Sequence, residues 1–109
     1  MVLNSILSNL ISNSIKYSDN KKTEKFIKIT FLSEKGKAVL KVEDNGIGIR
    51  KKEFSKVFER KFQVDEKSSE GGGIGLYMVQ KSVLLLGGTI NFKSNFGIGT
   101  EFIVELPIE

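Results

Sequence analysis

Two predicted β-hairpins constrain the fold of this chain more than any other feature of its sequence. In the first, Ile27, Ile29 and Phe31 alternate on one face of a strand, and Gly36 marks the turn into the next strand. In the second, residues 95–99 supply the turn. A sheet made of antiparallel hairpins needs helices over one face to enclose a core. The strands are expected at residues 26–32, 38–43, 89–94 and 100–106.

Three helices are predicted to provide that cover. The first spans residues 2–17, where apolar side chains follow the spacing of an amphipathic helix. Its stripe comprises Leu3, Ile6, Leu7, Leu10, Ile11 and Ile15. A short helix is expected at residues 51–59, and a longer one over residues 74–86 is stopped by two glycines. The order helix, hairpin, helix, loop, helix, hairpin predicts a two-layer α+β sandwich.

Composition limits both the size of the domain and its chemistry. The 109 residues fit one compact domain, and a hydrophobic content of 39% suffices for a core. There is no Cys and no His, which excludes disulfides, thiol nucleophiles and imidazole acid–base catalysis. The net charge of +4 arises from basic residues interleaved with acids, so we expect no nucleic-acid partner.

No segment of the sequence predicts membrane insertion. The longest apolar run, residues 83–86, is far shorter than a membrane span. We therefore expect a cytoplasmic domain, whether or not the parent protein is membrane-anchored.

One face of the first helix carries Asn9, Asn13 and Lys16, opposite the apolar stripe. A face of this kind is often no more than solvated surface. The alternative is that two amide oxygens and an ammonium group converge on a metal–phosphate group, since a carbonyl oxygen suits Mg²⁺ and a lysine suits phosphate. Helix position alone leaves both interpretations open.

The end of the second strand places a carboxylate beside the core. The two-residue period of residues 38–43 continues to Asp44, which would face the core and need a hydrogen-bond donor there. Asp44 could simply cap an ordinary turn. Alternatively, it could accept a hydrogen bond from an exocyclic amine such as that of adenine, with Gly46 and Gly48 letting the backbone approach the base.

A glycine run opens directly into the last helix. Residues 71–75 would expose backbone N–H groups at the positive end of the helix dipole, which favours an anion such as phosphate. The run could equally be a hinge in a mobile loop over residues 63–73. It is not a P-loop, because no Gly-Lys-Ser/Thr sequence ends it.

Taken in order, these segments resemble the sequence boxes of the GHKL superfamily of ATP-binding domains, specifically its histidine-kinase branch. The resemblance runs from about Leu3 to Pro107, with the boxes in the order of the family. They read NLISNSIKYS (N box), VEDNGIGI (G1), VFERKFQVD (F), GGGIGLYMV (G2) and GIGTEF (G3). The resemblance implies a mixed, mostly antiparallel sheet covered on one face by three helices, a flexible ATP lid, and ATP and Mg²⁺ as cofactors.

The same resemblance implies roles for individual residues. Asn13 would coordinate Mg²⁺ between the phosphates, with Asn9 and Lys16 contacting phosphate oxygens or metal-bound water. Asp44 would bind the adenine amine, and Phe58 would help to anchor the lid. The other residues expected to bind the nucleotide are Tyr17, Gly46, Gly48, Ile49, Phe62, Gly71, Gly73, Ile74, Gly75, Leu76 and Thr100.

Three positions depart from the family pattern or distinguish its branches. In the F box, Lys61 and Gln63 stand where an aromatic residue and an arginine are frequent, which leaves Arg60 and Lys61 as the basic residues available to the γ-phosphate. In the chaperone, gyrase and mismatch-repair members, a glutamate stands at the place of Asn9 and activates water. An amide cannot act as that base, so the histidine-kinase branch is favoured.

The resemblance therefore implies a domain that holds ATP and donates the γ-phosphate to a histidine on a separate dimerisation domain, and through it to a response regulator. Residues 1–109 would form one such domain, a fragment of a longer kinase that lacks the strand usually preceding the first helix. The alternatives are a GHKL-type ATPase or serine kinase, and a nucleotide-sensing module with weak catalysis.

Overall fold

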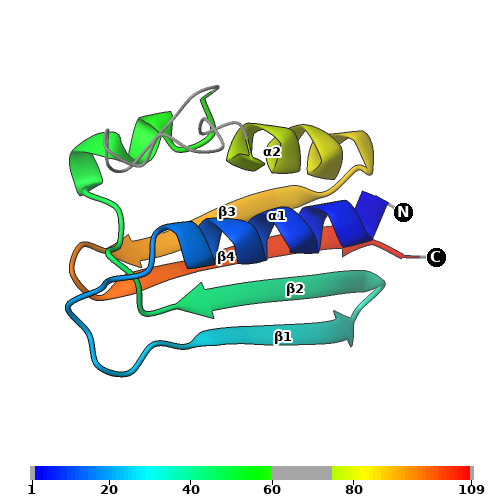
Figure 1. Cartoon of the computed structure of the whole chain (residues 1–109). Coiled ribbons are helices and arrows are strands. Elements are labelled where there is room, and N and C mark those ends of the chain that lie inside the picture. Colours follow the sequence, from blue (N-terminus) through cyan, green and yellow to red (C-terminus); the bar gives the residue numbers. More distant parts are fainter. Residues whose placement is uncertain (1, 60–74, 109) are drawn as a thin grey trace.

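The chain folds into two layers, a sheet and a set of helices on one of its faces (Figure 1). The computed structural model describes residues 2–59 and 75–108. The elements are α1 (Val2–Lys16), β1 (Ile27–Glu34), β2 (Lys37–Asp44), the 3₁₀ helix η1 (Lys51–Lys56), α2 (Gly75–Leu85), β3 (Thr89–Asn95) and β4 (Gly99–Pro107). The sheet has the order β1-β2-β4-β3. The predicted α+β sandwich is confirmed.

Two details of the fold differ from the expectation. All pairs among the four described strands are antiparallel, so the described sheet is not mixed. The short helix is a 3₁₀ helix of six residues without a side-chain cap at its start. Such a helix has weaker hydrogen-bond geometry than an α-helix and is normally short. The predicted lid, residues 63–73, lies outside the described residues.

Glycines set the ends of two elements. Lys35 and Gly36, with φ of 51° and 77°, form the two-residue turn that joins β1 to β2. After α2, Gly87 has a φ of 78°, and its N–H donates to the carbonyl of Leu84 at 3.0 Å. The N–H of Gly88 donates to the carbonyl of Val83 at 2.9 Å, which completes a Schellman motif. The predicted glycine stop of this helix is therefore present.

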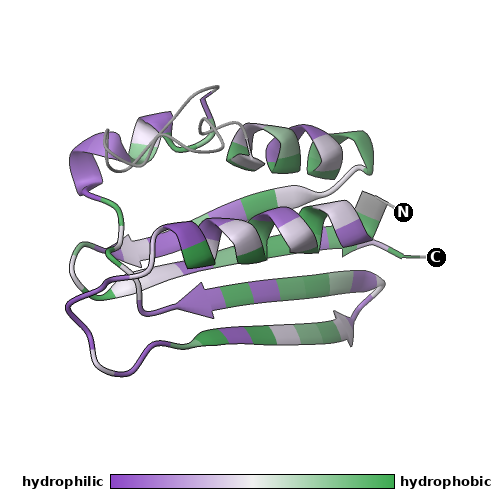
Figure 2. Cartoon of the chain, viewed as in Figure 1, coloured by the Kyte–Doolittle hydropathy of each residue, from purple (hydrophilic) through white to green (hydrophobic). Residues whose placement is uncertain are grey.

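The core lies between the helices and the inner strands of the sheet. Burial alternates along β2 and β4, because successive side chains of a strand point to opposite faces. Figure 2 shows apolar colour on the strands below α1 and α2. The largest fully buried side chains are Phe102, Ile6, Leu10, Val42, Val57, Val79, Val83 and Val104.

The edge strand β1 is less buried than its alternation suggests. Ile29 pairs with Val42 and Phe31 with Leu40, so all four side chains share the helix-facing side of the sheet. Ile29 and Phe31 nevertheless remain 47% and 57% exposed. The reason is position, since β1 lies at the edge of the sheet, beyond the β2 strand that α1 contacts. No helix among residues 2–59 and 75–108 is long and apolar enough to cross a membrane.

Candidate functional site

A small cavity lies where the end of α1, the start of α2 and the end of β2 come together. We call it the α2-side cavity. Its volume is about 10 Å³, which is about the space of one water molecule. Every residue that lines it belongs to the site predicted from the sequence. The lining consists of Asn13, Tyr17, Asp44, Gly48, Ile49, Leu76 and Thr100.

Two larger cavities also reach Asp44. The β1-side cavity, of about 360 Å³, lies between the end of α1 and the start of β1 and includes Ser14 and Phe26. The third, of about 320 Å³, lies at the ends of β2, β3 and β4 and includes Lys93 and Glu101. Size does not identify the site among these three cavities, because of the three the α2-side cavity alone brings Asp44 together with Asn13.

Asp44 is the central polar group of the site. It is only 9% exposed, as its position in the pattern of β2 predicted. Two groups supply the hydrogen bonds that a buried carboxylate requires. Ser14 Oγ donates to Asp44 Oδ2 at 2.9 Å, and the backbone N–H of Gly46 donates to Oδ1 at 2.8 Å. Asp44 therefore caps its own turn and is also tied to α1.

The loop after Asp44 is held between α1 and the turn from β3 to β4. The N–H of Ile47 donates to the carbonyl of Tyr17 at 3.0 Å, and the carbonyl of Ile47 accepts from Gly97 N–H at 2.7 Å. A Cβ at Gly46 would collide with the Tyr17 carbonyl oxygen. A Cβ at Gly48 would meet the backbone of Asn95 in the same way. Both glycines are thus required by neighbouring backbone, and of the two only Gly48 lines the α2-side cavity.

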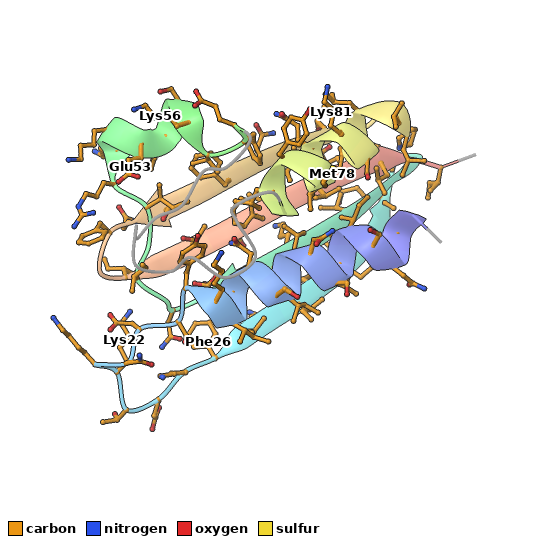
Figure 3. The ribbon with its side chains drawn as sticks, turned by 45° about the horizontal axis from the view of Figure 1, so that its top comes forward. Lys22, Phe26, Glu53, Lys56, Met78 and Lys81 are labelled. Carbon is orange, nitrogen blue, oxygen red and sulfur yellow. The ribbon has the colours of Figure 1, made fainter. Side chains whose placement is uncertain are left out.

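A lysine from the loop between α1 and β1 secures the same region (Figure 3). Lys22 Nζ donates to the carbonyl oxygens of Asn45 at 2.7 Å, Gly46 at 3.3 Å and Ile98 at 3.0 Å. An ammonium group has three protons and can serve three acceptors. Lys22 therefore joins the loop after β2 to the turn before β4.

Thr100 supports the site from the sheet. It pairs with Asp44 across β2 and β4, and its Oγ1 lies 2.8 Å from Ser94 Oγ. Ser94 Oγ also accepts from the N–H of Ile49 at 2.8 Å and donates to the carbonyl of Gly99 at 2.9 Å. Because Ser94 has one proton, this arrangement makes Thr100 the donor of the bond between the two hydroxyls.

The polar face of α1 lies toward α2 and is not fully solvated. Asn9, Asn13 and Lys16 are all partly buried. Asn9 Oδ1 lies 3.7 Å from the place that a Cβ at Gly75 would take, so this face meets the first residue of α2. Lys16 Nζ stands 5.4 Å from the ring centroid of Tyr17. Asn9, Lys16, Gly46 and Gly75 do not line the α2-side cavity itself.

Phe58 belongs to an aromatic cluster on the sheet. Its ring centroid lies 5.8 Å from that of Phe92 and 6.3 Å from that of Phe102, both edge to face. Phe54 contacts Phe92 at 5.0 Å. This packing fixes the segment after η1 to β3 and β4. Four predicted site residues lie outside the described part of the chain: Phe62, Gly71, Gly73 and Ile74. Arg60 and Lys61 lie there too.

Sequence reasoning missed three residues that shape the site, namely Ser14, Lys22 and Ser94. Ser14 could have been found, because it lies four residues after Leu10 within the apolar stripe of α1. A hydroxyl at a core position requires a partner. Lys22 and Ser94 carry no comparable signal, because Lys22 bonds to Asn45 and Ile98 and Ser94 accepts from Ile49, and these partners are distant in sequence.

Comparison with known proteins gives a consistent result. A family model described as "Histidine kinase-, DNA gyrase B-, and HSP90-like ATPase" matches residues 1–109. The sensor protein RprX of Bacteroides fragilis is 34% identical over an alignment of 113 residues that covers 99% of this chain and 21% of that protein. The autoinducer 2 sensor kinase/phosphatase LuxQ of Vibrio cholerae is 34% identical over 98% of this chain and 13% of its own length. The chain thus spans about a fifth or less of these relatives.

Solved structures share the fold. The mycobacterial sensor histidine kinase MprB matches with a TM-score of 0.82 and 28% identity, over 97% of this chain and 72% of that chain. Full-length ShkA, solved in complex with AMPPNP, matches with a TM-score of 0.81 and 26% identity, over 97% of this chain and 21% of that chain. These likenesses agree with the two-layer architecture described above.

Proposed function

Because this chain belongs to the family of histidine kinase-, DNA gyrase B- and HSP90-like ATPases, as an ATP-binding domain of the sensor histidine kinase type, we propose that it presents Mg·ATP to a histidine on a separate domain. The observation that carries the proposal is the α2-side cavity, where Asp44 and Asn13 meet. In this proposal Asn13 faces the phosphates and Asp44 faces the base, and both residues line one cavity.

Asp44 is the residue proposed to bind adenine. Each carboxylate oxygen can accept about two hydrogen bonds, and each has one donor from the protein. One further acceptor position on the carboxylate suffices for the 6-amino group of adenine. Tyr17, Ile49 and Leu76 line the same cavity and offer apolar contact to the base. The cavity of about 10 Å³ must widen for a base to enter.

Asn13, Asn9 and Lys16 are the residues proposed to face the phosphates. Among the described residues there is no group of three or more His, Cys, Asp or Glu side chains that could hold a metal ion. A magnesium ion bound here would rely on the Asn13 amide oxygen, phosphate oxygens and water, a ligand set that suits Mg²⁺. Bound in this way, the ion would neutralise charge on the transferred phosphoryl group.

The proposed reaction transfers the γ-phosphoryl group between two domains. The bond between the γ-phosphorus and the bridging oxygen breaks, ADP leaves, and a new bond forms to an imidazole nitrogen. This chain contains no His, so a histidine acceptor lies outside these residues; we place it on a separate dimerisation domain of the same kinase, which would pass the phosphoryl group to a response regulator. Asn9 supplies no base to activate water, so the domain would hold ATP with little hydrolysis.

Calorimetry with ATP, with and without Mg²⁺, tests the binding half of the proposal. Asn13→Ala should abolish the Mg²⁺-dependent part of the affinity, and Asp44→Asn should weaken binding of the base. Asn91→Ala and Glu43→Gln are matched controls, because Asn91 is exposed on β3 and Glu43 points to the other face of β2. ATP binding by both site variants at the wild-type level would show that the site is wrong.

Transfer to an added histidine-bearing dimerisation domain of a sensor kinase tests the chemical half. The expected product is an acid-labile phosphate on that domain. Steady ATP hydrolysis by the isolated chain would instead indicate an ATPase. Binding without any transfer would indicate a nucleotide-sensing module.

A further inference from the structure

Ser14 is a buried hydroxyl that the proposed reaction does not use directly. It is 2% exposed, lies in α1 one residue after Asn13, and donates to Asp44 Oδ2 at 2.9 Å. Burying a hydroxyl is unfavourable unless it is hydrogen-bonded, and this bond joins the helical layer to the sheet across 30 residues of sequence. Its geometry therefore depends on the tertiary fold.

Ser14 approaches Asp44 from behind the α2-side cavity. It is absent from the lining of that cavity and instead lines the β1-side cavity, together with Ile15 and Phe26. Asp44 lines both cavities. With respect to the α2-side cavity, Ser14 is thus placed to act on a bound base through the carboxylate.

The two donors to Asp44 constrain it differently. Gly46 N–H comes from the loop that follows Asp44, so this bond can persist when the loop moves as a unit. Ser14 comes from α1, the helix that also carries Asn13 and Tyr17 of the α2-side cavity. The Ser14 bond therefore fixes the carboxylate relative to the other residues that would surround a nucleotide.

We propose that Ser14 is a positioning residue that sets selectivity for a 6-aminopurine, an inference that rests on the proposed adenine-binding role of Asp44. With Oδ2 held by Ser14, the remaining acceptor positions of the carboxylate have a fixed direction. A 6-amino group can donate into that direction. A 6-oxo group, as in guanine, is a hydrogen-bond acceptor and would face the carboxylate, which is also an acceptor, so a 6-oxopurine binds less tightly. Without Ser14, the carboxylate can rotate and the preference weakens.

Three nucleotides and four variants separate this role from a purely structural one. ATP carries the 6-amino group, purine riboside triphosphate has no substituent there, and GTP has the 6-oxo group. Ser14→Ala should lower ATP affinity about three- to tenfold, the usual range for one hydrogen bond. It should leave the affinity for purine riboside triphosphate within about twofold, because that ligand makes no bond to Asp44. Ser14→Thr keeps the hydroxyl and should restore ATP affinity.

Ser12→Ala is the matched control, since Ser12 is an exposed serine of the same helix. Circular dichroism melting of every variant verifies that it is folded. Equal weakening of ATP and purine riboside triphosphate by Ser14→Ala would overturn the inference and assign Ser14 a structural role. If wild type and Asp44→Asn both bind ATP no better than purine riboside triphosphate, the adenine-binding role of Asp44 fails instead. Discrimination that Asp44→Asn removes and Ser14→Ala leaves intact would contradict the Ser14 inference alone.

Discussion

Lys22 Nζ lies 2.7 Å from the carbonyl oxygen of Asn45 and 3.0 Å from that of Ile98, so one side chain joins two loops that are 53 residues apart (98 − 45). Both loops border Asp44, because Asn45 follows it directly and Ile98 lies in the turn before its pairing partner Thr100. The two loops that border the site are therefore held together by a residue that lies outside every sequence box.

Lys22→Met should lower the free energy of unfolding by about 2 kcal/mol, because hydrogen bonds to charged groups are lost and backbone carbonyls lose their partner. Urea denaturation provides the measurement. Lys21→Met, at the exposed neighbouring position, should change it by less than about 0.5 kcal/mol. Equal stability of the two variants would show that the three contacts contribute nothing.

Gly48→Ala should destabilise the fold far more than Gly97→Ala. Both glycines have positive φ, at 78° and 87°, which costs an alanine about 1–2 kcal/mol. A Cβ at Gly97 meets nothing within 4 Å, whereas one at Gly48 collides with the Asn95 backbone. We expect about 1 kcal/mol for Gly97→Ala and at least about 3 kcal/mol for Gly48→Ala in thermal or urea unfolding. Similar losses would mean that the close approach to Asn95 is not important.

Phe92→Leu should cost about 1–2 kcal/mol, because Phe92 makes edge-to-face contacts with Phe54 and Phe58 at 5.0 and 5.8 Å. Phe96→Leu is the comparison, since Phe96 is 50% exposed. Its ring faces the Arg50 guanidinium at 4.0 Å, and Phe96→Leu should lower the free energy of unfolding by less than about 1 kcal/mol. Chemical denaturation of both variants distinguishes a packed cluster from surface aromatics.

Mg·ATP at one hundred times its dissociation constant should raise the free energy of unfolding by about 2.7 kcal/mol, since a ligand that binds only the native state stabilises it by mass action. Asp44→Asn at the same ATP concentration should show a clearly smaller gain. The readout is the shift of the thermal midpoint with nucleotide concentration. A stabilisation that does not depend on residue 44 would contradict adenine binding by Asp44.

Sequence reasoning succeeded where the signal is local. The apolar stripe of α1 and the glycines after α2 predicted helix boundaries to within one residue at most ends, and the pattern of residues 38–43 predicted that Asp44 faces the core. The ordered boxes contain all seven residues that line the α2-side cavity, but other residues predicted from the boxes, such as Asn9 and Gly75, do not line it. Their roles in binding ATP and Mg²⁺ stay predictions.

The remaining features depend on contacts between distant segments. Alternation in β1 predicted a strand but not its exposure, because edge position is decided by the pairing of the whole sheet. The glycine at residue 46 predicted close approach, but the group that approaches is the Tyr17 carbonyl. A serine within an apolar stripe indicates that its hydroxyl needs a buried partner, but not that this partner is Asp44, 30 residues away.

Because Ser14 of α1 is hydrogen-bonded to Asp44 of β2, the distance between the helical layer and the sheet also affects the direction of the Asp44 carboxylate. Leu10, one turn before Ser14, is fully buried in the core between α1 and the sheet. A substitution there that slides the helix by a fraction of an ångström would misalign the carboxylate without touching it. Random mutagenesis scored on nucleotide affinity should consequently recover changes in the apolar interior as well as changes in polar groups.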